Sequence, residues 1–183
     1  MSKDGIFLRE LERGDLSTIN AWRADRSLVS LLGGNFRHVG REIDDKWFDA
    51  YLGSRANNVR LAVCMASSGA LVGVTYLLGI DWLNRSAEFS IQIGAESARG
   101  RGMGEAAARS ILAHAFTDLN LHRVSLDVLE GNARAIALYE KLGFRTEGLH
   151  RQAVFKDGQY LNVVSMALLS TDFAEPSSAP VGD

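Results

Sequence analysis

Glycines and arginines alternate in a short turn that precedes an amphipathic run ending at residue 119. The turn consists of Arg99, Gly100, Arg101, Gly102, Met103 and Gly104. The first amide groups of a helix have no partner within that helix, and the helix dipole adds a partial positive charge at the same end. Glycines let an anion approach these amides because no Cβ is in the way. The turn is therefore expected to bind a phosphate group, most favourably a diphosphate.

Several unrelated turns of this kind bind phosphates. A Walker-type loop requires a Lys followed by Ser or Thr after its last glycine, and Glu105 and Ala106 occupy those positions. A dinucleotide-binding turn requires the spacing G-x-G-x-x-G and an acidic residue about twenty positions later. The spacing here is G-x-G-x-G, and no clean equivalent of the acidic residue follows. A glycine-rich helix start without any ligand remains the alternative.

A second motif lies further along the chain. The segment 132–144, NARAIALYEKLGF, predicts a short helix that begins at an Asn N-cap and ends at Gly143. Together the two segments resemble the GNAT superfamily of acetyl-CoA-dependent N-acetyltransferases, with its motifs [RQ]-x-x-G-x-[GA] and N-x-x-A-x-x-x-Y-x-x-x-G-F. The matching residues are Arg99, Gly102, Gly104, Asn132, Ala135, Tyr139, Gly143 and Phe144.

The resemblance extends over about residues 5–170 and is strongest over 86–145. Within the superfamily the chain is most similar to the branch of ribosomal-protein N-terminal, spermidine and nucleotide-amino-sugar acetyltransferases. The segments AEFSIQIG, LNLHRVSL and KDGQYLNVVSMALL carry this narrower similarity.

The resemblance implies that acetyl-CoA is the co-substrate and that the strand 86–94 splays from the strand 122–129. Main-chain groups of Ile91 and Ile93 would bind the pantetheine arm between these strands, and residues 99–104 would hold the pyrophosphate. Ile91 and Ile93 also suit a core, which is compatible with a main-chain role. Asn132 is expected to cap its helix and to contact the cofactor, although the cap alone explains this residue.

The implied reaction is direct attack of a primary amine on a thioester in a ternary complex. An alkylammonium has a pKa of about 10.4, so a proton must leave before the attack at neutral pH. Glu88, on the polar face of the strand 86–94, is the expected proton acceptor, directly or through water. A solvated carboxylate or an ion pair with Arg85 is the alternative. The resemblance places Tyr139 beside the sulfur of CoA, as an acid or a hydrogen-bond donor, with a core tyrosine as the alternative.

The elements that position these residues follow from periodicity and turn signals. Strands are expected at 6–11, 59–65, 70–80, 86–94, 122–129, 145–155 and 160–169, and helices at 14–25, 42–55, 104–119 and 132–142. This order predicts an α/β (α+β) fold with one mixed, largely antiparallel sheet flanked by helices. A single GNAT-like domain over 1–173 and a disordered tail over 174–183, which contains both prolines, complete the prediction.

Composition narrows the function classes. The net charge of −2 gives no overall basic field for nucleic acid or a membrane surface. No apolar stretch approaches the about 20 residues of a membrane helix, and the first residues lack a signal-peptide pattern, which predicts a cytoplasmic protein. The lone Cys64 is expected to be a buried, inert thiol. The four histidines show no metal-ligand spacing, so no metal is expected.

The acceptor amine stays open at this stage. A polyamine would require clustered acids, which the loop 31–40 lacks, and Asp45 and Asp49 are expected on an exposed helix face. Arg37 and Arg41 suit an anionic acceptor such as a nucleotide-linked amino sugar, and a peptide α-amine is a further candidate. A non-catalytic acyl-CoA-binding protein and an interaction module with a vacant turn are the alternatives to an enzyme. Exposed strand edges are compatible with a homodimer.

Overall fold

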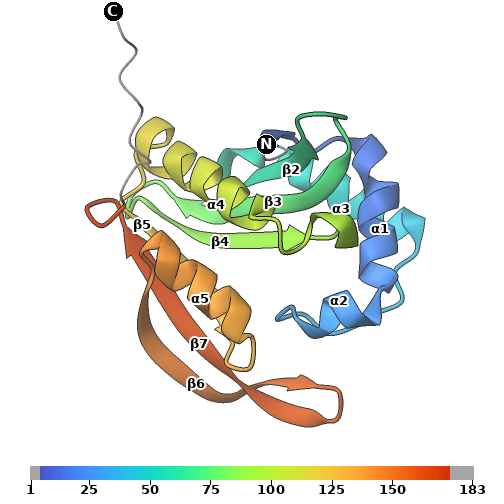
Figure 1. Ribbon diagram of the computed structural model, residues 1–183. Helices are drawn as coiled ribbons and strands as arrows, with labels where there is room; N and C mark the ends of the chain where they lie inside the picture. The colour runs from blue at the N-terminus through green and yellow to red at the C-terminus, as the bar shows by residue number, and fades with distance from the viewer. Residues whose placement is uncertain (1–4, 174–183) are drawn as a thin grey trace, which may run out of the picture.

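The computed structural model describes residues 5–173, and the predicted tail 174–183 lies outside the described residues. A seven-stranded sheet with the order β1-β2-β3-β4-β5-β7-β6 forms its centre (Figure 1). The strands are β1 Ile6–Glu10, β2 Val59–Met65, β3 Leu71–Asp81, β4 Ser86–Ile93, β5 Arg123–Leu129, β6 Arg145–Lys156 and β7 Gln159–Leu169. Neighbouring strands are antiparallel except for β4 and β5. The mixed, largely antiparallel sheet confirms the predicted fold class.

Helices cover both faces of the sheet (Figure 1). They are α1 Leu16–Ala24, α2 Arg26–Ser30, α3 Arg41–Gly53, α4 Met103–Ala113 and α5 Ala133–Leu142, with a π turn over His114–Asp118 and 3-10 turns over Arg13–Asp15, Arg55–Asn57 and Glu96–Ala98. Apolar residues of α4 and α5 pack in one core cluster, and those of α1 and α3 pack in another, which also contains the buried Cys64. The sequence did not predict α2, which lies between the first expected helix and the loop 31–40.

The central strands splay, as the resemblance implied. β4 and β5 pair in parallel only over Ser86–Glu88 and Arg123–Ser125, although β4 continues to Ile93 and β5 to Leu129. Phe89 on β4 is buried in the core beneath α4, whereas its neighbour Glu88 is exposed on the other face. Beyond Glu88 the edge of β4 that faces β5 therefore has no strand partner.

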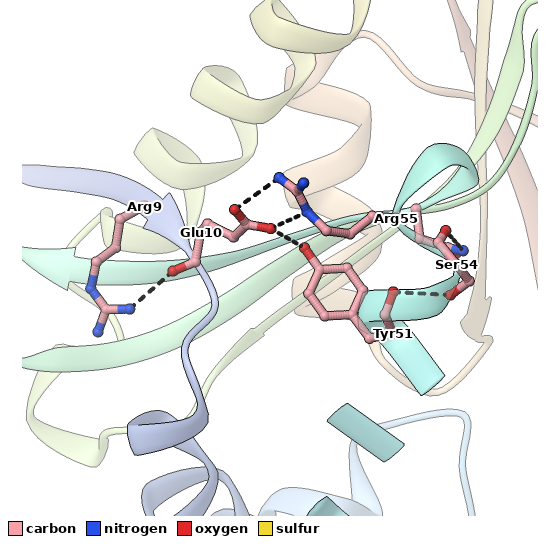
Figure 2. A network of polar contacts seen from close by, with 6 residues as sticks. Arg9, Glu10, Tyr51, Ser54 and Arg55 are labelled. Atoms are coloured by element: carbon pink, nitrogen blue, oxygen red, sulfur yellow. Dashed lines mark hydrogen bonds and ion pairs between the residues drawn. The ribbon is translucent and has the colours of Figure 1, made fainter. Parts of the chain in front are cut away.

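A polar network fixes the end of α3 against β1 (Figure 2). The Tyr51 hydroxyl donates to Glu10 Oε1 at 2.8 Å, and Arg55 Nη2 donates to Glu10 Oε2 at 2.9 Å. Burial and the Glu10 hydrogen bond raise the pKa of Tyr51. In this orientation Asp45 and Asp49 are exposed and pair with Arg13, as expected of that helix face.

Ile43, on the same helix, does not belong to its buried face. Its side chain is 56% exposed, whereas Phe48 and Tyr51 are buried. Asp44 is the buried residue of the first turn instead, and it accepts hydrogen bonds from Asn20 and Arg23. A charged side chain with two donors can replace an apolar one in the core because its desolvation is compensated.

Asp15 precedes the first residue of α1, and its carboxylate does not cap the helix amides. It accepts from Arg9 Nη1 and Nη2 at 2.8 and 2.7 Å and from the Glu12 amide at 2.9 Å. Burial acts to raise the pKa of Asp15, and the Arg9 and Glu12 hydrogen bonds outweigh it, so the net shift is downward. The pair joins β1 to α1.

The structure of residues 5–173 bears on the membrane and metal predictions. None of the helices there is long and apolar enough to cross a membrane. The same residues contain no group of three or more His, Cys, Asp or Glu side chains that could hold a metal ion. Burial raises the pKa of the Cys64 thiol, in keeping with the inert thiol that the sequence predicts.

Candidate active site

A cleft of about 670 Å³ opens where β4 and β5 separate. Its walls come from β4, β5, the glycine turn, the first turns of α5 and the segment after α2. Of the residues proposed from the sequence, those that line it are Glu88, Ile91, Ile93, Arg99, Gly100, Gly102, Gly104, Asn132 and Tyr139. Residues from both sequence motifs therefore meet in one cavity.

The glycine turn has the backbone geometry that the sequence implies. Gly100 and Gly102 have φ angles of 78° and 81°, in the left-handed region that favours glycine. Gly102 is the N-cap of α4, and no side chain caps that helix end. The first amides of α4 therefore have no intrahelical partner and border the cleft. This is an anion-binding arrangement of the kind expected at a helix N-terminus.

Arg99 uses its side chain differently from the expectation. Its Nε and Nη2 donate to the carbonyl oxygens of Ile93 at 3.2 Å and Gly94 at 2.7 Å, so the guanidinium fixes the turn to the end of β4. Arg101 is exposed and does not line the cleft, and the Met103 side chain is buried in the core. Arg134, which sequence reasoning did not single out, supplies a second cation at the turn beside Gly100.

Tyr139 reaches the cleft from α5. Its ring packs edge-on against Phe89, with centroids 6.2 Å apart, and against Phe144 at 5.8 Å. The phenol has no hydrogen-bond partner among residues 5–173, and burial raises its pKa to about 12. Tyr139 is thus a core residue that also lines the cleft.

Asn132 caps α5, as the motif predicts, and its Oδ1 accepts from the Ala135 amide at 3.2 Å. Its Nδ2 donates to the carbonyl oxygen of Leu31 at 3.1 Å. One side chain therefore connects the start of the Tyr139 helix with the segment after α2.

Glu88 and Asp127 face the cleft from opposite sides of the splay. Glu88 is in register with Ser125, and Asp127 lies two residues further along β5, so the three side chains share one face of the sheet. Ser165 Oγ donates to Asp127 Oδ1 at 2.7 Å. Arg85 does not pair with Glu88, because it donates to the backbone and side chain of Asn120 instead.

Sequence reasoning missed Asp127. The signal was present in the alternation of β5, where Arg123, Ser125 and Asp127 occupy the polar positions between buried apolar residues. Its meeting with Glu88 depends on the parallel register of two strands that are distant in the sequence.

The family model described as the acetyltransferase (GNAT) domain matches residues 6–145. This chain belongs to the GNAT acetyltransferase family. The match spans the glycine turn and α5. This chain is an acetyl-CoA-dependent N-acetyltransferase, as the two motifs implied.

Two curated relatives and one crystal structure illustrate the similarity. The spermidine N(1)-acetyltransferase of Vibrio cholerae is 32% identical to this chain, and the alignment covers 94% of this chain and 97% of the relative. The putative ribosomal N-acetyltransferase YdaF of Bacillus subtilis is 33% identical over 57% of each chain. The crystal structure of spermidine N-acetyltransferase from Vibrio cholerae in complex with CoA and spermine has a TM-score of 0.84, covering 91% of this chain and 96% of that one.

Proposed function

We propose that this enzyme acetylates a polyamine, with Glu88 and Asp127 binding ammonium groups of the acceptor. The observation that carries the proposal is the pair of carboxylates on one face of the splayed sheet. The two cations among the lining residues, Arg99 and Arg134, are at the glycine turn rather than beside the carboxylates. Similar proteins named for spermidine acetylation add support.

Asp127 changes the balance among the acceptors considered from the sequence. The argument against a polyamine rested on the loop 31–40, which has no acidic residue. Asp127 supplies the second carboxylate from β5 instead. An anionic nucleotide sugar is less well suited to this half of the cleft, because it would place negative charge against two carboxylates. A peptide α-amine would use one carboxylate and leave the other without a cation.

The donor half of the cleft is assigned to acetyl-CoA, which supplies the acetyl group as an activated thioester. The free amides at the start of α4, with Arg134 nearby, would bind the pyrophosphate. Ile91 and Ile93 lie on the unpaired edge of β4, where main-chain groups are available to the pantetheine arm. Arg99 and Met103 would contribute through the backbone, since their side chains hold the turn in place.

Glu88 and Tyr139 are assigned to proton handling. Glu88 would accept the ammonium proton, directly or through water, and thereby release the nucleophilic lone pair. Tyr139 would donate a hydrogen bond to negative charge that develops on the departing sulfur. Its free phenol is suited to this role because no protein acceptor among residues 5–173 competes for the proton.

The test is acetyl-CoA turnover with four amines: spermidine, a monoamine of similar length, a peptide with a free N-terminus and an amino sugar. Spermidine is expected to have the highest kcat/KM. D127N should raise KM for spermidine about tenfold or more, the effect of losing one charge-assisted contact, and should change KM for the monoamine much less. E42Q, at an exposed carboxylate of α3, is the control variant. Equal effects of D127N on both amines, or a preference for the peptide, would overturn the assignment.

E88Q separates acid–base chemistry from binding. It should lower kcat/KM at neutral pH and move the pH profile toward higher pH, where more of the amine is already neutral. An unchanged profile would remove Glu88 from this role.

We further propose that the enzyme forms a homodimer through the β6–β7 hairpin. β6 is an edge strand of the sheet, and Leu149, Phe155 and Tyr160 of this hairpin are about half exposed or more. Exposed apolar side chains beside an unpaired edge favour association. Size-exclusion chromatography with light scattering tests the proposal, and a monomer at micromolar concentration would contradict it.

A further inference from the structure

Lys156, the last residue of β6, has an unusual environment for a lysine. Its side chain is 5% exposed, and its Nζ donates to three backbone carbonyl oxygens: Val29 at 2.7 Å, Leu32 at 2.5 Å and Gly34 at 2.8 Å. An ammonium group has three N–H donors, so all of them are used. Burial lowers the pKa of Lys156, and the neighbouring Asp157 carboxylate acts in the opposite direction.

The three carbonyl groups belong to the end of α2 and the residues that follow it. The last carbonyls of a helix have no partner within the helix, and a cation at that end is favourable. Lys156 thus ends a helix of five residues that would be marginal by itself. Leu28 and Val29 within α2 are buried, and Asp25 caps its first turn, whereas Gly33 and Gly34 after the helix add no side-chain packing.

The same stretch forms a wall of the active-site cleft. Leu28, Leu31, Leu32, Gly33 and Gly34 all line it. Within residues 5–173, two side chains outside the segment donate to its backbone: Lys156 to the three carbonyls, and Asn132 to Leu31 O. Of the two, Lys156 makes more contacts and does not line the cleft.

We propose that Lys156 is a positioning residue for the acceptor: its ammonium group holds residues 29–34 in place as the wall against which the amine binds. This inference rests on the acceptor half assigned above. Lys156 acts through the backbone and touches no substrate. The donor turn is held independently, by Arg99 on the carbonyls of Ile93 and Gly94. Loss of Lys156 is therefore expected to weaken binding of the amine and not binding of acetyl-CoA.

The experiment compares K156M with K46M, the same substitution at an exposed lysine of α3. Hydrogen exchange of residues 26–40, measured without substrates, reports how readily the backbone of this segment opens. Steady-state kinetics report KM for the amine and for acetyl-CoA separately. Because K156M loses three charge-assisted hydrogen bonds, it should accelerate exchange in this segment and raise KM for the amine about tenfold or more. KM for acetyl-CoA should stay within about twofold of the wild-type value. K46M should match the wild type in all three measurements.

Two results would overturn the inference. One is folded K156M with wild-type exchange over residues 26–40. The other is accelerated exchange with an unchanged KM for the amine, which would make the contact structural only. If K156M does not fold, K156Q decides by the same two criteria, because its neutral amide has two N–H donors for three carbonyls. Hydrogen exchange needs no acceptor, so failure of the polyamine assignment would be recognised separately, in the amine panel.

Discussion

Replacing Tyr139 by Phe removes one oxygen atom and leaves the packing of α5 intact. The Tyr139 ring is 9% exposed and contacts Phe89 and Phe144, contacts that a phenylalanine ring retains. The phenol has no hydrogen-bond partner among residues 5–173, so the substitution breaks no bond within this part of the fold. The free energy of unfolding should therefore change by less than about 1 kcal/mol. Any loss of activity would then report the reaction and not the fold.

The size of that loss follows from the environment of the phenol. Burial raises the pKa of Tyr139 to about 12. A thiol has a pKa of about 8.5, so complete transfer of the phenol proton to the thiolate would be uphill by about 5 kcal/mol. The favoured role is a hydrogen bond to the developing charge. Loss of one such donor in other enzymes lowers kcat by about 10²–10³-fold, and we expect Y139F to fall in this range.

The assay is the initial rate of thiol release over a range of acetyl-CoA concentrations, with thermal unfolding of the same preparation. Y139F should lower kcat without a comparable rise in KM for acetyl-CoA, and its melting temperature should match the wild type. The phenol stays protonated between pH 6 and 10, so the shape of the pH profile should also be unchanged by Y139F. Wild-type kcat, or a profile that loses a limb in this range, would refute the reasoning.

Three further substitutions test the supports of the site. G102A, at a φ of 81°, should destabilise by about 1–2 kcal/mol and raise KM for acetyl-CoA, whereas G53A, where a Cβ meets no atom within 4 Å, should leave that KM unchanged. G94A would place its Cβ 1.9 Å from the Trp22 ring, so we expect a destabilisation of about 1–3 kcal/mol by thermal unfolding. Asp15 has a lowered pKa in the fold, so its contribution to stability is present above about pH 4 and is lost as the pH falls through the folded value. D15N should lower the free energy of unfolding, measured with urea, by about 1.5–3 kcal/mol at pH 7 and by less at pH 3. An equal loss at both pH values would contradict this.

The sequence predicted the local structure of the glycine turn and of α5 well because its determinants are local. The glycine turn and the first turn of α4 are contiguous, and so are Asn132 and Tyr139 on α5. Alternation along β4 correctly placed Glu88 opposite Phe89. Each of these features depends on the period of one element or on the chemistry of one turn.

Side-chain direction within the turn was not predictable in the same way. The sequence placed Arg99 and Arg101 in the turn that is expected to hold the pyrophosphate. The structure turns Arg99 onto the carbonyls of β4 and leaves Arg101 outside the cleft. Both outcomes depend on where β4 ends relative to α4, which residue spacing does not specify. The short helix α2 was missed for a related reason, since its carbonyls are satisfied by a lysine from the opposite end of the chain.

The half of the cleft that we propose for the acceptor is assembled by contacts between distant parts of the chain, and this has a functional consequence. Asn132 binds a carbonyl 101 positions away, and Lys156 binds one 122 positions away. Asp127 meets Glu88 only through the register of β4 and β5. None of these contacts involves the glycine turn. Substitutions in residues 29–34 or at Asp127 can therefore change which amine is bound while binding of acetyl-CoA is kept. A shared donor motif therefore identifies the acetyl transfer, and the acceptor must be derived from Asp127 and from the segment that Lys156 holds.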